Sequence, residues 1–120
     1  MLRHERIRAW ELCHELTLAV YRSTETWPKS ELYGVTSQLR RAAVSAAANI
    51  AEGAAKLGSR EFRRYADTSL GSLAEVSYLL RLARDLEFLE PAEHAVLEDL
   101  RKRAGGMTWK LACALGKAKG

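Results

Sequence analysis

Residues Gln38–Gly53 read QLRRAAVSAAANIAEG, an alanine-rich stretch that decides the fold of this 120-residue chain. At about 100° per residue, its largest apolar row falls on one face of a helix. The row is formed by Leu39, Ala42, Ala43, Ala46 and Ile50. The spacing therefore predicts a long helix that packs this row into a hydrophobic core.

Two further rows on the same stretch are unusual for a helix that packs on one side only. A polar row lies on one narrow line and is formed by Gln38, Arg41, Ser45, Asn49 and Glu52. The remaining side carries small or apolar residues, where a surface helix normally carries charge. These residues are Val44, Ala47, Ala48 and Ala51. Small side chains let another backbone approach closely, so we expect this helix to have neighbours on more than one side.

Helical periodicity continues outward from this stretch in both directions. It predicts four helices, at about 4–26, 31–57, 60–88 and 91–115, in one domain that spans 1–120. No strand pattern is present, and the connections are short, which favours antiparallel packing of consecutive helices. We therefore expect an all-α fold, an antiparallel up-down-up-down four-helix bundle.

Helix boundaries follow from residues with known positional preferences. We expect Gly58 to end the second helix in a left-handed conformation and Ser59 to cap the third. Pro91 is favoured in the first turn of the fourth helix. Gly105-Gly106 predicts a bend or fraying there, and we expect residues 116–120 to be disordered.

Each of the other helices also carries an apolar seam. The first helix has Ala9, Cys13, Leu16, Val20 and Trp27. The third has Phe62, Ala66, Ser69, Leu73, Val76, Leu80 and Ala83. The fourth has Leu97, Leu100, Ala104, Met107, Leu111 and Leu115. A second apolar stripe, on the third helix, consists of Leu79, Leu82 and Leu86.

The polar row of the second helix needs partners if it is covered. A hairpin about Gly58 would place Arg41 near Glu75, Ser45 near Leu70 and Glu52 near Arg63. We expect Asn49 to bond a backbone group or a hydroxyl such as that of Tyr65. The structural interpretation is a network that fixes the register of the helices, formed by Gln38, Arg41, Ser45, Asn49, Glu52 and Glu75. The functional alternative is a ligand or nucleic-acid site.

The positive charge is concentrated near the C-terminus. The net charge is +4, yet residues 1–100 carry 13 Lys/Arg against 15 Asp/Glu, and residues 101–120 carry six Lys/Arg and no acid. Such asymmetry hints at a polyanionic partner, although basic residues also serve solubility. The candidate contacts to a nucleic-acid backbone are Arg40, Lys56, Arg60, Arg63, Arg64, Arg101, Lys102, Arg103 and Lys110.

Catalytic and metal-binding signatures are weak in this sequence. A Glu-x-x-His motif occurs once, at Glu11–His14, whereas a di-iron bundle needs two such motifs and two further glutamates. No phosphate-binding glycine loop is present. We therefore expect no enzyme activity, no catalytic residue, no metal and no cofactor. Cys13 and Cys113 are expected to be reduced thiols, which an up-down bundle could also bring close together.

Membrane and export signals are also missing from the pattern. No apolar run approaches the ~20 residues that cross a bilayer. The first residues, MLRHERIRAWE, lack the apolar core of a signal peptide. We expect a cytoplasmic protein with no membrane contact.

Several motifs resemble one known family. They are Trp10-Glu11, Tyr21, Pro28, Glu31, Tyr33-Gly34, Gln38–Ala42, Ser45, Asn49–Gly53, Ser59, Glu61-Phe62, Gly71-Ser72 and Glu75. They resemble the four-helix-bundle proteins encoded by intervening sequences in bacterial 23S ribosomal RNA genes. That family includes the accessory variability protein of diversity-generating retroelements. The resemblance covers about residues 5–89, and the fourth helix carries no matching motif.

The resemblance implies a bundle without enzyme activity that assembles into a homopentamer. Its retroelement member implies nucleic acid and a reverse transcriptase as partners. The extra apolar rows support only an assembly of more than one copy. The candidate interface residues are Val44, Ala47, Ala48, Ala51, Leu79, Leu82 and Leu86. Two hypotheses follow: an oligomer that binds RNA or DNA by charge, or a structural, protein-interaction module that binds no nucleic acid.

Overall fold

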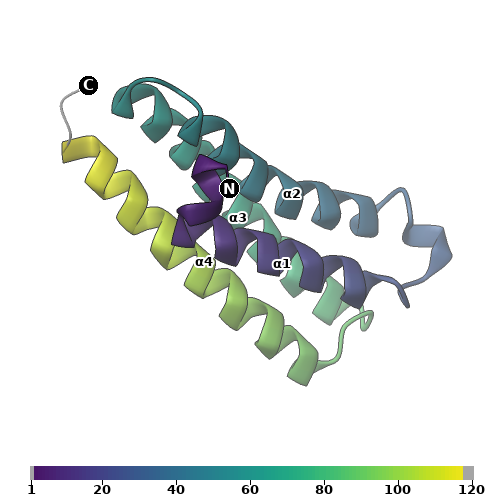
Figure 1. Cartoon of the computed structure of the whole chain (residues 1–120). Helices are drawn as coiled ribbons and strands as arrows, with labels where there is room; N and C mark the ends of the chain where they lie inside the picture. The colour runs from purple at the N-terminus through teal and green to yellow at the C-terminus, as the bar shows by residue number, and fades with distance from the viewer. Residues whose placement is uncertain (1, 118–120) are drawn as a thin grey trace.

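All regular structure in residues 2–117, which this computed structural model describes, is helical (Figure 1). Two 3₁₀ turns, η1 (Arg3–Arg6) and η2 (Lys29–Glu31), accompany four α-helices. The α-helices are α1 (Arg8–Thr24), α2 (Val35–Ala54), α3 (Ser59–Asp85) and α4 (Pro91–Lys117). The prediction of an all-α chain with four helices is confirmed.

Each α-helix packs against two others, in the order α1–α2–α3–α4 and back to α1. The molecule is elongated, with extents of 47 × 22 × 22 Å. In Figure 1 the four helices lie side by side along this length. The α2–α3 connection and the end of α4 lie at one end, while the α1–α2 and α3–α4 connections lie at the other.

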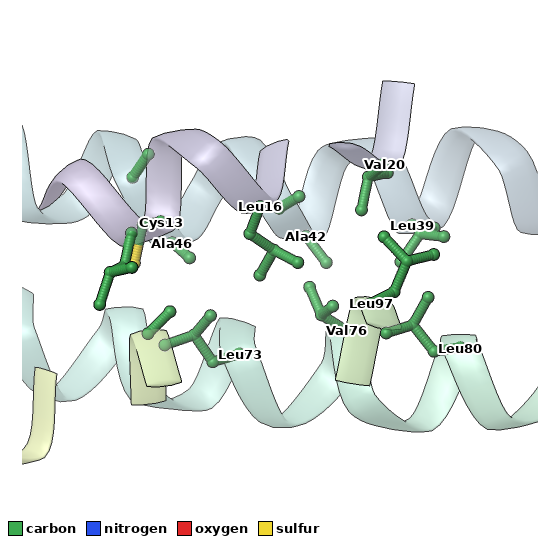
Figure 2. Close-up of a cluster of buried hydrophobic side chains, with 14 of the residues drawn as sticks. Cys13, Leu16, Val20, Leu39, Ala42, Ala46, Leu73, Val76, Leu80 and Leu97 are labelled. Atoms are coloured by element: carbon green, nitrogen blue, oxygen red, sulfur yellow. The ribbon is translucent and has the colours of Figure 1, made fainter. Parts of the chain in front are cut away.

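The core runs along the centre of the four helices. Figure 2 shows Leu16 and Val20 of α1 and Leu97 of α4 among the apolar side chains that fill it, with leucine, valine and alanine from α2 and α3. The predicted seams of α1, α2 and α3, with Trp27 just beyond α1, are buried along their whole length. Because their periodicity matches the α-helical repeat, each seam stays on the inner side of its helix.

The seam predicted for α4 is only partly right. Leu97 and Ala104 are buried, but Leu100, Met107, Leu111 and Leu115 are only partly buried. The deeply buried positions beyond Ala104 are instead Thr108 and Ala112. Thr108 satisfies its hydroxyl by donating to the backbone carbonyl of Ala104 at 2.8 Å. Small residues thus face the core, and the larger ones lie at the edges.

Two predicted caps are wrong. Gly58 is the N-cap of α3 with φ −115°, so it is not a left-handed residue. Ser59 is the first helical residue, and its buried hydroxyl has no hydrogen-bond partner in the described residues. The left-handed conformation occurs at Glu87 instead, with φ 64°, after α3. Helix α2 starts later than predicted because the chain turns at Gly34, where Glu31 accepts the backbone N–H of Val35 at 3.3 Å.

The two glycines of α4 do not interrupt it, contrary to the prediction. Gly105 and Gly106 lie inside a helix that continues to Lys117, and Gly116 is also helical. The buried row from Ala104 to Thr108 spans the glycines and keeps this part of α4 against the core. The rest of the segment predicted to be disordered, 118–120, lies outside the described residues. No helix within residues 2–117 has the length and apolar character to cross a membrane.

The two cysteines are free thiols. The sulfur of Cys13 lies 3.9 Å from the hydroxyl oxygen of Thr108, so Cys13 is level with Thr108 on α4. Cys113 follows Thr108 by five residues, which places it on another side of α4, because five residues rotate by about 500°. Burial raises the pKa of the Cys13 thiol from 9.0 to about 11, although hydrogen-bond contacts with Thr108 and Ser69 lower it in part.

Candidate nucleic-acid interface

Serine and asparagine side chains join α2 to α3 along the polar row. The hydroxyls of Ser45 and Ser72 lie 2.8 Å apart, and Asn49 donates to the Ser45 carbonyl at 2.8 Å and to its hydroxyl at 3.1 Å. Ser69 is buried and donates to the Ala46 carbonyl at 2.8 Å. Ser45 therefore faces Ser72 rather than Leu70. Asn49 bonds a backbone group and a hydroxyl, as predicted, and both belong to Ser45.

The charged members of the polar row do not form the predicted pairs. Arg41 and Glu75 are both exposed and form no ion pair with each other, and Glu52 and Arg63 likewise remain apart. Gln38 is exposed as well. These side chains are exposed, so water solvates their charges and ion pairs between them would gain little.

Two of the arginines proposed as nucleic-acid contacts are engaged by other side chains of the bundle. Arg40 donates from Nε to the Thr24 hydroxyl at 2.8 Å, and its guanidinium lies 4.7 Å from the ring centre of Tyr21. Arg101 donates from Nε to Glu98 at 2.6 Å, with side chains that are 20% and 17% exposed. Arg40 therefore links α2 to α1. Arg101 uses two of its guanidinium nitrogens to bind Glu98, so this pair of donors is not available to a phosphate.

Glu98 connects Arg101 to the packing between α3 and α4. Ser77 of α3 donates to the other oxygen of Glu98 at 2.9 Å, which joins α3 to α4. Burial alone would raise the pKa of the Glu98 carboxyl, but hydrogen bonds from Arg101 and Ser77 outweigh it and hold the pKa below its usual range. The charged pair thus fixes the packing of two helices.

The other candidate cations are exposed. Arg64 pairs with Glu61 at 2.9 Å, and the Lys56 ammonium lies 5.3 Å from the ring centre of Tyr65. The Arg63 guanidinium lies against Gly116, which brings the start of α3 to the end of α4. The remaining exposed candidates are Arg60, Lys102, Arg103 and Lys110.

A basic end forms where the chain brings three segments together. The bundle can be divided into two halves across its long axis. The dividing level is where Thr17 bonds Ala43 and Ser45 bonds Ser72. On one side lie residues 3–18, 42–74 and 103–117, with ten Lys/Arg against six Asp/Glu. The other side, residues 19–41 and 75–102, has eight Lys/Arg against nine Asp/Glu. We call the first group the basic end.

A hollow of about 300 Å³ lies between α1 and α4 at the basic end. Arg8 and Leu12 line it from α1, and Arg103, Gly106, Met107 and Lys110 line it from α4. Neither Arg103 nor Lys110 forms an ion pair with the described residues, whereas Arg8 pairs with exposed Glu11 at 3.2 Å. Sequence reasoning missed Arg8, because only the contact between α1 and α4 places it beside the basic residues of α4.

The predicted interface rows are exposed only in part. Ala47 and Leu79 are buried in the monomer, so they belong to the bundle core and are not free for a second copy. Val44 is 42% exposed and Leu86 is 47% exposed. Ala48, Ala51 and Leu82 are partly buried. Larger exposed apolar groups that the prediction left out are Leu57, Tyr33, Tyr78, Val96 and Trp109.

His4 and His14 both contact the ring of Trp10. The Trp10 ring stacks on His14 with centres 4.9 Å apart, and His4 meets it edge-on at 4.7 Å. Within residues 2–117, no group of three or more His, Cys, Asp or Glu side chains is placed to hold a metal ion. The geometry offers cationic and stacking contacts at the surface.

Comparisons with known proteins place this fold in one family. The family model described as 23S rRNA-intervening sequence protein matches residues 5–110. A crystal structure of a protein of unknown function from the S23 ribosomal protein family of Bacteroides thetaiotaomicron has a similar fold, with a TM-score of 0.77 at 15% identity. The similarity covers 87% of this chain and 97% of that chain. No curated protein matches this sequence. The chain belongs to the 23S rRNA-intervening sequence protein family.

Proposed function

We propose that this protein is an antiparallel up-down-up-down bundle that assembles with copies of itself and binds the phosphate backbone of RNA or DNA at its basic end. The observation that carries the proposal is the excess of four positive charges where residues 3–18, 42–74 and 103–117 meet at one end of the bundle. Antiparallel packing is supported by contacts at both ends: Arg63 lies against Gly116, and Ser23 donates to Glu93 at 2.9 Å.

Charge repeated in an assembly would strengthen such binding. Each copy contributes an excess of four positive charges at the basic end, by the count above. Phosphate contacts release condensed counterions, so the affinity falls steeply with salt and depends little on base sequence. The hollow between α1 and α4 supplies two cations without acidic partners, Arg103 and Lys110. Because the family description names 23S rRNA, RNA is the first nucleic acid to test.

Assembly is supported by apolar side chains on two different sides of the bundle. Val44 belongs to the α2 row that faces outward beside α1, since its neighbour Arg40 contacts Tyr21. Leu82 and Leu86 lie at the far end of α3. Two unlike patches suit a head-to-tail contact that closes into a ring, whereas a twofold dimer uses one patch twice. The pentamer remains the expectation from the family resemblance.

Nucleic-acid binding is tested by charge reversal at the two ends. The double variant Arg103→Glu, Lys110→Glu changes the hollow, and its matched control, Arg22→Glu, Lys29→Glu, makes the same charge change at exposed positions of the other end. We expect wild type and control to bind a short RNA at low salt. The first variant should bind single-stranded RNA at least tenfold more weakly and lose about 1.4 from the slope of log affinity against log salt, at about 0.7 per contact.

Two outcomes would contradict this proposal. Equal weakening by both double variants would refute a local site and indicate only a general charge effect. Lack of RNA and DNA binding by wild type at low salt would remove this function. The protein would then be an interaction module, for which exposed Trp109 and Tyr78 offer contact area.

Self-assembly is tested by mass measurement with light scattering. Val44→Glu should lower the mass of the particle, because it places a charge in the proposed interface. Val96→Glu, at an exposed apolar position of α4, is the matched control and should leave the mass unchanged. A wild-type particle of 13.4 kDa at high protein concentration would refute the assembly.

A further inference from the structure

A second hollow lies far from the basic end, where α1 ends and α2 begins. Its volume is about 380 Å³. It is lined by Tyr21, Leu32, Tyr33, Ser37, Arg40 and Arg41. Two arginines and two phenol rings therefore surround one surface cavity that the basic end does not include.

Arg40 presents a fixed hydrogen-bonding surface to this hollow. Its Nε is occupied by the Thr24 hydroxyl at 2.8 Å, and its plane is held by the Tyr21 ring at 4.7 Å. No described residue accepts a hydrogen bond from its two terminal nitrogens. A guanidinium that is already ordered loses little entropy when a ligand binds, and its planar fork matches two oxygens of a phosphate.

The surroundings of Arg40 add charge and a free aromatic ring. Arg41 is exposed and forms no ion pair with residues 2–117. The nearest acid along the chain, Glu31, is turned toward the start of α2, where it accepts the N–H of Val35. Tyr33 is 93% exposed, so its ring packs against almost nothing in this chain. Tyrosine rings of this kind stack on nucleobases.

We propose that this hollow binds a nucleotide, with the phosphate between Arg40 and Arg41 and the base against Tyr33. A free phosphate would leave the ring of Tyr33 unused, and an uncharged nucleoside would leave both guanidinium groups without an acceptor. A nucleotide uses both features in one cavity. The proposal does not rest on the basic end, because the hollow lies in the other half of the molecule.

The experiment is a titration of the full chain with adenosine 5′-monophosphate, monitored by amide chemical shifts or calorimetry. Adenosine and inorganic phosphate are titrated separately to distinguish the contributions of base and phosphate. We expect saturable nucleotide binding with shifts confined to residues 21–41. Tyr33→Ala should weaken it about 5- to 150-fold, which is the range for loss of one stacking contact. Arg41→Gln should weaken the binding of the nucleotide and of phosphate, and it should leave the binding of adenosine unchanged.

Matched controls separate the site from general surface effects. Tyr78→Ala removes an equally polar ring that is 62% exposed on α3, and Arg81→Gln removes an exposed arginine; neither should change the affinity. Lack of saturable binding up to about 10 mM nucleotide would overturn the proposal. So would equal affinity for phosphate alone, or an affinity that Tyr33→Ala leaves unchanged. The variant Arg103→Glu, Lys110→Glu should bind the nucleotide normally, so this result and the result for RNA are independent.

Discussion

Replacing Gly53 with alanine tests how closely α2 and α3 approach. A Cβ at this position would lie 2.7 Å from Cδ1 of Phe62 and 2.8 Å from the Cβ of Tyr65. The Phe62 ring is itself buried and cannot move freely, and the Tyr65 Cβ moves only with its backbone. The methyl group would therefore push the two helices apart.

Two opposing effects set the size of the change. Alanine is better than glycine in a helix interior by about 1 kcal/mol, which favours the variant. Overpacking of a core typically costs about 1–3 kcal/mol, and separation of the helices adds lost contacts. Since the clash involves a backbone-linked atom, we expect the cost to prevail. The net loss of unfolding free energy should be about 2 kcal/mol, or a fall in Tm on the order of 5–10 °C.

The assay is urea unfolding followed by circular dichroism, at one protein concentration for all variants. Gly106→Ala is the matched control, because a Cβ there would meet no atom within 4 Å. It should stabilise the protein by up to about 1 kcal/mol. A Gly53→Ala midpoint equal to or above that of wild type, with an unchanged slope, would refute the close approach of α2 and α3.

Two further predictions concern buried polar groups. At pH 8, iodoacetamide followed by mass spectrometry should modify half-buried Cys113 and spare Cys13 until the chain unfolds; equal rates would contradict the burial. Because the folded pKa of Cys13 is raised, its contribution to stability is present below pH 9.0 and is lost as pH rises through about 11. Arg101→Met should cost about 2 kcal/mol at pH 7, since Glu98 loses its partner. Because the folded pKa of Glu98 is lowered, this cost should shrink as pH falls below its ordinary value of 4.5, and an equal cost at pH 3 would refute the ion pair's role.

The core of the fold could be predicted from the sequence because periodicity encodes it directly. The apolar row of α2 that runs from Leu39 to Ile50 and the seam of α3 repeat every three or four residues, and every member of both is buried. The same rule failed on α4, where large Leu100 and Leu111 lie at the edges and small Thr108 and Ala112 face the core. A prediction from hydrophobicity places the larger apolar residues in the core. In α4 the short distance to the neighbouring helices instead favours small residues at the core positions.

Helix ends and polar partners were less predictable because they depend on local geometry. Ser59 is a favoured cap residue, yet the chain places Gly58 at the cap position, and the serine hydroxyl stays without a partner. Across the hairpin, Ser45 meets Ser72 rather than Leu70, an offset of two residues. Two residues rotate a helix by about 200°, which is enough to turn a predicted partner to another side.

The charge of this protein has a different distribution in space from its distribution along the chain. The sequence places the basic excess in residues 101–120, but Arg101 is held by Glu98, and Lys102 lies in the more acidic half. Arg103 and Lys110 instead join Arg8, from the start of the chain, around one hollow. In a ring closed by rotation, every copy would present the same end in the same orientation. The basic ends would then lie on one circle, so a long nucleic acid could contact several copies at once, with an avidity that no single bundle provides.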